Sequence, residues 1–177
     1  MDVRLVTADE VDVLVAHLAR QLEDDSRLRE PVSPRGRFRE FDRAQARRRR
    51  LDGWKRDTTE ASWARAWGAW DGEAIVGHAE LHASELPTAS HRGTLGLAVE
   101  AHARRRGVAT ALMTALLDWA RGDENVSWID LGVFANNPVA EALYRGLGFH
   151  EIGRTHDCFR VDGFVITDIS MTLNVDE

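Results

Sequence analysis

An apolar run that leads through three arginines and a glycine into an amphipathic segment limits the possible folds of this chain more than any other feature. Residues 94–99 are almost continuously apolar, which is typical of a strand at the centre of a sheet. Residues 107–121 place apolar side chains at the spacing of one helix face. Arg104-Arg105-Arg106-Gly107 joins the two. The pattern predicts a buried strand that passes through a short loop into a packed helix, and hence a domain containing both strands and helices.

The start of the predicted helix offers hydrogen-bond donors to an anion. Backbone amides from about Arg105 to Thr110 would point outward without a partner inside the helix. Gly107 and Ala109 carry almost no side chain, so an anion can approach this backbone closely. The arginines and the positive end of the helix dipole favour the same ligand. The segment therefore predicts a phosphate-binding site.

A second segment, about thirty residues later, predicts a short helix that carries a tyrosine. The helix covers residues 138–147, with Asn137 as its N-cap, a proline at its first position and Gly148 at its C-terminal end. Tyr144 is the only tyrosine in the chain. It shares one helical stripe with Ala140, Leu143 and Leu147. Packing in the core is therefore an alternative to a chemical role for this side chain.

Periodicity and turn residues predict the remaining elements. Apolar or alternating runs predict strands at residues 2–6, 63–70, 73–82, 94–99, 128–134, 149–154 and 164–173. Helical spacing predicts helices at residues 8–24, 37–52, 107–121 and 138–147. Asp71-Gly72 predicts a hairpin between the second and third strands. Strand–helix alternation with hairpins in 177 residues predicts a mixed α/β sheet in a single domain, residues 1–177.

Composition excludes several classes of protein. With Cys158 as its one cysteine, the chain can form neither an internal disulfide nor a cysteine-based metal site. The seven histidines show no metal-ligand spacing, so no metal is expected. No apolar stretch is long enough to cross a bilayer, and the first residues do not begin a signal peptide. We therefore expect a cytoplasmic protein that has no membrane partner.

Charge is unevenly distributed. The net charge is −6, yet residues 35–56 hold ten Arg or Lys against three acids, a net of +7, which leaves −13 for the rest. An acidic body favours a cationic substrate, whereas the basic stretch favours an anion or is simply a solvated helix face. Nucleic-acid binding through Arg47-Arg48-Arg49-Arg50 is an alternative that we do not favour. The whole chain is acidic, and no recognition motif surrounds the run.

The two segments resemble the motifs of a known superfamily. Leu95-Gly96-Leu97-Ala98-Val99 followed by Arg104-x-x-Gly107-x-Ala109 resembles the acetyl-CoA signature of the GNAT superfamily of N-acetyltransferases. Asn137-x-x-Ala140-x-x-Leu143-Tyr144 with Leu147-Gly148-Phe149 resembles its second motif. The resemblance implies a mostly antiparallel twisted sheet of six to seven strands flanked by helices. It further implies a cofactor-binding part at about 92–150, acceptor-side helices at about 8–56, and acetyl-CoA as co-substrate.

The resemblance also implies an activity and roles for individual residues. The acetyl group would pass directly to a primary amine in a ternary complex, and Tyr144 would be the general acid that protonates the leaving thiolate. Residues expected to bind acetyl-CoA are Leu97, Ala98, Val99, Arg104, Arg105, Arg106, Gly107, Val108, Ala109, Thr110, Asn137, Ala140 and Tyr144. A homodimer is a further expectation.

The general base is less clear. In relatives a glutamate often serves from the fourth or fifth strand, but the corresponding positions here are Gly93 or Thr94, and Gly132, none of which can be a base. Glu80 is the first candidate, because its strand should border the acceptor site. Other candidates are Glu100, His82, His91 and Asp130. A water relay stays open as a further alternative.

The acceptor is also open. We expect Phe38, Phe41 and Trp54 to select it, and it could be a protein N-terminus or lysine, an amino acid, a polyamine or an amine drug. A non-catalytic acyl-CoA-binding module is the alternative function. Gly93 and Gly132 would favour it, and Tyr144 speaks against it. A covalent route through Cys158 is disfavoured, because a lone cysteine is more often a buried apolar residue.

Overall fold

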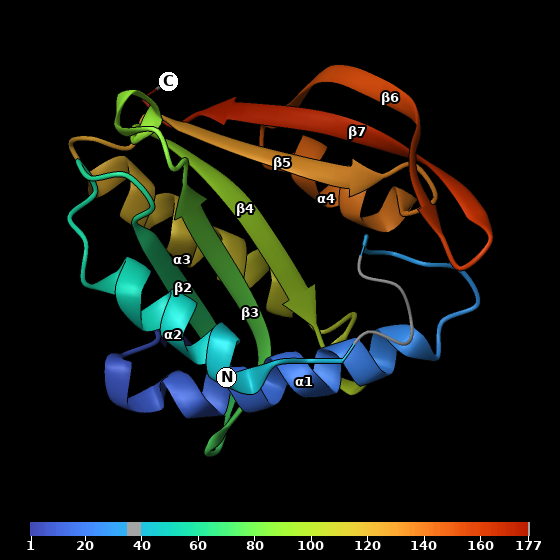
Figure 1. Ribbon diagram of the computed structural model, residues 1–177, viewed down its shortest axis with the longest axis horizontal. Helices are drawn as coiled ribbons and strands as arrows, with labels where there is room; N and C mark the ends of the chain where they lie inside the picture. Colours follow the sequence, from blue (N-terminus) through green and yellow to red (C-terminus); the bar gives the residue numbers. More distant parts are fainter. Residues whose placement is uncertain (35–39, 177) are drawn as a thin grey trace.

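One seven-stranded sheet organises the part of the chain that the computed structural model describes, residues 1–34 and 40–176 (Figure 1). The strands are β1 (Asp2–Leu5), β2 (Ala64–Asp71), β3 (Ala74–Ala83), β4 (Arg92–Val99), β5 (Trp128–Phe134), β6 (His150–Val161) and β7 (Phe164–Asn174). The α-helices are α1 (Val11–Ser26), α2 (Arg43–Trp54), α3 (Val108–Gly122) and α4 (Pro138–Gly146). Short 3-10 turns are η1 (Ala8–Glu10), η2 (Pro87–Ala89) and η3 (Ala101–Ala103).

The strand order is β1-β2-β3-β4-β5-β7-β6. All neighbouring strands pair antiparallel except β4 and β5, which run parallel. This topology confirms the expected mixed α/β fold with a mostly antiparallel sheet. The single parallel pair is its most important feature, because it marks the place where the sheet divides.

Helices cover both faces of the sheet on its β1–β4 side (Figure 1). The buried face of α3, which includes Leu112 and Leu116, joins Trp67 of β2 and Leu81 of β3 in the larger core cluster. α1 and α2 lie on the opposite face, in front of the sheet in Figure 1, and we call this the α1 face. Between the irregular pairing near Val76 and the end of β3, side chains alternate between the two faces: Ala79 and Leu81 lie in the larger core cluster, whereas Glu80 contacts Arg50 of α2. No helix in the described ranges is both long and apolar enough to span a membrane.

α2 begins later and ends later than predicted. It starts at Arg43 because Asp42 is its N-cap, whose side chain accepts a hydrogen bond of 2.8 Å from the Gln45 amide. The helix continues through Gly53 to Trp54 instead of ending before this glycine. A Cβ at Gly53 would lie 2.7 Å from the Ala64 Cβ. The glycine therefore serves close packing of α2 against β2 rather than helix termination.

Two of the three aromatic residues expected to select the acceptor pack against the protein core. Phe41 and Trp54 are partly buried and pack against the smaller core cluster, which α1 forms with β2 and β3. They therefore anchor α2 to the sheet. Phe38 lies outside the described residues.

β6 is longer than predicted and forms a hairpin with β7. It extends to Val161, which pairs with Phe164 across a two-residue turn. In that turn Asp162 and Gly163 have φ of 50° and 84°, the left-handed conformation that Asp-Gly readily adopts. The dipeptide that predicts the β2–β3 hairpin therefore occurs here as well. Irregular register near Thr155–Phe159 hides the strand's alternation from sequence analysis.

Candidate active site

The sheet divides between its two parallel strands (Figure 1). β4 and β5 pair only at Arg92–Trp128, Gly93–Ile129 and Thr94–Asp130. Beyond these pairs, β4 continues to Val99 paired only with β3, and β5 continues to Phe134 paired only with β7. We call this divergence the fork. Backbone groups on an unpaired strand edge can bind an extended ligand as another strand would. The predicted contact residues Leu97, Ala98 and Val99 lie on this edge of β4.

The start of α3 lies just beyond the end of β4 and has the predicted bare backbone. Gly107 is the N-cap with φ of 78°, and Arg105 is also left-handed with φ of 58°. The first helical bond runs from the Ala111 amide to the Gly107 carbonyl, so the amides of residues 108–110 have no partner within α3. A Cβ at Gly107 would meet nothing within 4 Å. An anion therefore has open access to these donors.

The three arginines before Gly107 divide into two kinds. Arg105 and Arg106 are exposed and form no ion pair within the described parts of the chain. Arg104 instead donates to the Val99 carbonyl over 2.9 Å, and its guanidinium lies 3.9 Å from the Asp25 carboxylate. Arg105 and Arg106 are therefore available to an anion, whereas Arg104 ties the loop to the end of β4 and to α1.

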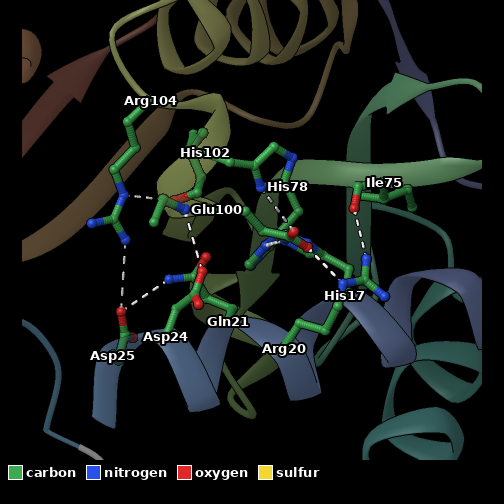
Figure 2. Close-up of polar contacts among 12 residues, drawn as sticks. His17, Arg20, Gln21, Asp24, Asp25, Ile75, His78, Glu100, His102 and Arg104 are labelled. Atoms are coloured by element: carbon green, nitrogen blue, oxygen red, sulfur yellow. Dashed lines mark hydrogen bonds and ion pairs between the residues drawn. The ribbon is translucent and has the colours of Figure 1, made fainter. Parts of the chain in front are cut away.

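α1 holds the same loop through a buried acidic residue (Figure 2). Glu100, at the end of β4, is 6% exposed and accepts hydrogen bonds from Arg20 over 3.0 Å and from His17 over 2.7 Å. The Asp24 carboxylate accepts from the Ala101 amide over 3.3 Å. These contacts fix the segment that leads into Gly107, so α1 supports the anion site without being part of it.

His17 is a residue that sequence analysis missed. It is fully buried on α1, between Glu100 and His78, whose Nδ1 lies 2.9 Å from His17 Nε2. Burial lowers the pKa of His17, although Glu100 acts in the opposite direction. The available signal was a histidine three residues after Leu14, on the apolar stripe of the helix.

α4 carries Tyr144 against the core near β5 and β7. The tyrosine is 7% exposed, and its ring packs edge-on against Phe149 with centroids 5.8 Å apart. Burial raises the pKa of Tyr144 to about 12. Its hydroxyl has no hydrogen-bond partner among the described residues, and it is not among the enclosed polar atoms without partners. The hydroxyl is therefore reached by solvent and can donate to a ligand.

Asn137 and Ala140 open the same helix. The Asn137 side chain accepts from the Ala140 amide over 3.3 Å and so caps α4, as predicted. Its carbonyl oxygen is engaged in this cap. Its backbone N–H donates to the Phe134 carbonyl over 2.8 Å and its backbone carbonyl accepts from the Glu141 amide over 3.2 Å, so the side-chain amide nitrogen is the donor left for the expected contact with acetyl-CoA.

Glu80, the first candidate for the general base, lies in a buried ion pair. Both carboxylate oxygens of Glu80 accept hydrogen bonds from Arg50, over 2.6 and 2.8 Å, and His82 lies 3.3 Å away. Although burial disfavours the charged form, the charge of Arg50 holds the pKa of Glu80 well below its usual range. A carboxylate held ionised in this way takes up a proton poorly. Glu80 is thus a structural partner of α2 and an unsuitable base.

Comparison with known proteins agrees with this arrangement. The Acetyltransferase (GNAT) family matches residues 19–149. An L-amino acid N-acetyltransferase, AaaT, of Escherichia coli is 34% identical over 79 residues, which cover 45% of this chain and 48% of the relative. An N-alpha-acetyltransferase, RimI, of Mycobacterium tuberculosis is 31% identical over 96 residues, which cover 54% and 58%. The chain thus spans about half the length of the curated relatives it matches.

Solved structures share the fold over nearly the whole chain. The structure of yncA from Salmonella typhimurium, solved with its cofactor acetyl-CoA, superposes with a TM-score of 0.78 at 16% identity. The match covers 100% of this chain and 95% of that one. At this identity the likeness concerns the fold alone. The family match covers well over half of the sequence and includes both predicted motifs, so this chain belongs to the Acetyltransferase (GNAT) family.

Proposed function

We propose that this protein is an N-acetyltransferase that moves an acetyl group from acetyl-CoA to a primary amine by direct attack in a ternary complex. The observation that carries the proposal is the fork together with the start of α3, where backbone amides without helical partners lie just beyond the end of β4. The curated relatives are named as N-acetyltransferases, and a structural neighbour was solved with acetyl-CoA.

Acetyl-CoA would bind along β4 and at the start of α3. The pyrophosphate would accept hydrogen bonds from the amides of residues 108–110, with Arg105 and Arg106 adding positive charge. The pantetheine arm would pair with the free edge of β4 at Leu97 and Val99, because that edge has no strand partner past Thr94. The cradle fits the ligand, since Gly107 leaves the approach open.

Tyr144 would supply the proton that the leaving thiolate needs. As the amine nitrogen bonds to the acetyl carbon, the carbon–sulfur bond breaks and the electron pair goes to sulfur. Because burial raises the pKa of Tyr144 to about 12, its hydroxyl stays protonated at neutral pH.

The acceptor is proposed to be an α-amine. The two curated relatives are named for an L-amino acid and for an N-alpha position, and both names describe α-amino groups. A free amino acid or a peptide N-terminus would fit this class. We propose a cytoplasmic location, since Cys158 has no partner cysteine and suits a reducing compartment. A homodimer stays a prediction.

A turnover assay tests the function. The purified protein would be mixed with acetyl-CoA and a panel of free amino acids, N-terminal peptides, lysine peptides and polyamines, while released CoA thiol is followed with a thiol-reactive dye. We expect turnover that depends on the amine and saturates with both substrates, with α-amines preferred. Acetyl-CoA binding without turnover on any amine would instead support the non-catalytic binding module.

A further inference from the structure

Two neighbouring strands place a carboxylate beside the fork. Gly132 lies on β5, two residues past the last β4–β5 pair, on the same face as Asp130. This is the α1 face, because Asp130 pairs with Thr94, which in turn pairs with His82. A Cβ at Gly132 would lie 2.9 and 3.0 Å from the carboxylate oxygens of Asp168 on β7. The Asp168 carboxylate therefore occupies the space that a side chain at position 132 would fill.

The Asp168 carboxylate differs from those of Glu80 and Asp130 in having no partner among the described residues. Glu80 is bound by Arg50, and Asp130 is bound by Arg92 over 2.6 and 2.8 Å. The Asp168 side chain forms no hydrogen bond or ion pair with any residue in ranges 1–34 and 40–176. Natural proteins rarely leave a partly buried carboxylate unpaired without a reason.

Neighbouring charged groups do not shift the pKa of Asp168. Burial alone raises the pKa of Asp168, with no contribution from a neighbouring charge. Asp130 on β5 is already neutralised by Arg92, and His156 on the adjoining β6 has Nδ1 3.3 Å from Thr167 Oγ1. A carboxylate in this setting binds a proton more readily than one in water.

A carboxylate in this setting can assist amine acetylation. The α-ammonium of a peptide has a pKa of about 7.7–8.0, so the nitrogen must lose one proton before it can attack. As the nitrogen–carbon bond forms, the nitrogen becomes much more acidic, and a carboxylate can then accept its second proton. A group accepts the proton better when its pKa lies closer to the working pH, and burial moves the pKa of Asp168 in that direction.

We propose that Asp168 is the general base of this protein, an assignment that rests on the proposed acetyl transfer. Its carboxylate attracts the acceptor ammonium into the fork, where the ammonium releases one proton to solvent and becomes the neutral amine. Asp168 then takes a second proton from the nitrogen as the nitrogen–carbon bond forms. The carbon–sulfur bond breaks, and Tyr144 passes its proton to sulfur. The base thus lies on β7, and its carboxylate occupies the space above Gly132 of β5.

Asp168→Asn tests the assignment, because it keeps the shape and removes the proton acceptor. We expect kcat with a saturating amine to fall about a hundredfold at neutral pH, in the range typical of general base catalysis. The acidic limb of the wild-type kcat–pH profile should disappear as well. The matched control is Asp157→Asn, on exposed β6 and paired with Arg160, which should keep kcat and the limb unchanged.

Two further readouts separate the outcomes. Acetyl-CoA affinity and melting temperature of Asp168→Asn should equal those of the wild type, which shows that the variant is folded. A kcat within threefold of the wild type, or a lower kcat with the acidic limb in its original place, would overturn the assignment of Asp168 alone. A wild-type protein that turns over no amine would overturn the proposed function and this assignment together.

Discussion

The two sides of the fork use charge in opposite ways. At the start of α3, Arg105 and Arg106 are exposed, without ion-pair partners among the described residues, and the amides of residues 108–110 have no helical partners. On the α1 face, Glu80 and Asp130 are held by Arg50 and Arg92. The first region keeps its positive groups ready for a ligand, whereas the second uses most of its charges to join strands and helices.

The difference indicates where a ligand can add binding energy. An anion at the start of α3 gains hydrogen bonds that the folded protein leaves unmade. On the α1 face a ligand that binds Glu80 or Asp130 would have to displace an existing ion pair, and breaking the buried Glu80–Arg50 pair costs several kcal/mol. Asp168 is the exception, so the acceptor amine has one clear anchor. Substitutions at the start of α3 should therefore weaken ligand binding, whereas those in the ion pairs of the α1 face should weaken the fold.

Gly107→Glu should nearly abolish acetyl-CoA binding, since it places a negative charge where the pyrophosphate would lie. We expect the Kd to rise about a thousandfold, equivalent to about 4 kcal/mol. Gly107→Gln is the control, because it imposes the same left-handed backbone strain without the charge. Calorimetric titration measures both variants. Equal affinities for Glu and Gln would mean that no phosphate lies near this glycine.

Glu80→Gln should destabilise the protein without removing a catalytic group. It leaves the buried Arg50 charge unpaired, which costs about 3 kcal/mol in the free energy of unfolding. Urea unfolding at neutral pH measures the loss. The double variant Arg50→Met/Glu80→Met removes both charges and should recover most of the stability. A single variant as stable as the wild type would contradict the structural role.

The same pair predicts a pH dependence of stability. The folded pKa of Glu80 lies well below its ordinary value near 4.5, so ionised Glu80 stabilises the fold fully above that pH. The contribution is lost as the pH falls through the lowered folded value. The wild type should therefore lose its stability advantage over Glu80→Gln below pH 4.5. An advantage that stays constant through strong acid would show that ionisation is not its source.

Tyr144→Phe should lower kcat about a hundredfold and leave acetyl-CoA affinity unchanged, because it removes only the proposed proton donor. Since the pKa of Tyr144 is raised to about 12, the wild type should show no alkaline fall in kcat from this group below pH 10. Steady-state kinetics and calorimetry measure the two effects. An unchanged kcat across the pH range would assign the tyrosine to the core alone.

Glu100→Gln should weaken the support of the α3 loop without touching the reacting groups. It removes the charge that Arg20 and His17 bind, so we expect KM for acetyl-CoA to rise about tenfold with kcat nearly constant. Glu23→Gln is the control on α1, the helix that carries Arg20 and His17, because Glu23 forms an exposed pair with Arg27. A fall in kcat with constant KM would argue against a positioning role.

The sequence predicts the start of α3 but not the ion pairs of the α1 face. The anion site and the α4 cap depend on neighbours in the chain, so short motifs around Gly107 and Asn137 are sufficient to place them. The ion pairs of the α1 face join distant residues: Glu80 lies 30 positions from Arg50, and Glu100 lies 83 from His17. No local pattern records such pairs, so the sequence did not reveal that Arg50 holds the carboxylate of Glu80.

Element types were easier to predict than their ends. The prediction for β5 matches its observed limits because a compact apolar run defines the strand. The predicted β6 ends too early because its bulged register breaks the alternation, although Asp162-Gly163 marked its turn. Gly53 looks like a helix stop in the sequence, yet its role depends on Ala64 of β2, which only the folded structure brings within reach.

A calorimetric titration of the wild-type protein would decide whether the start of α3 binds phosphate. Acetyl-CoA would be compared with the acetyl thioester of pantetheine, which lacks the phosphates. We predict saturable binding of acetyl-CoA and at least a hundredfold weaker binding of the pantetheine thioester. No binding of acetyl-CoA, or equal binding of the two thioesters, would contradict a phosphate site at the start of α3 and with it the proposed acetyl transfer.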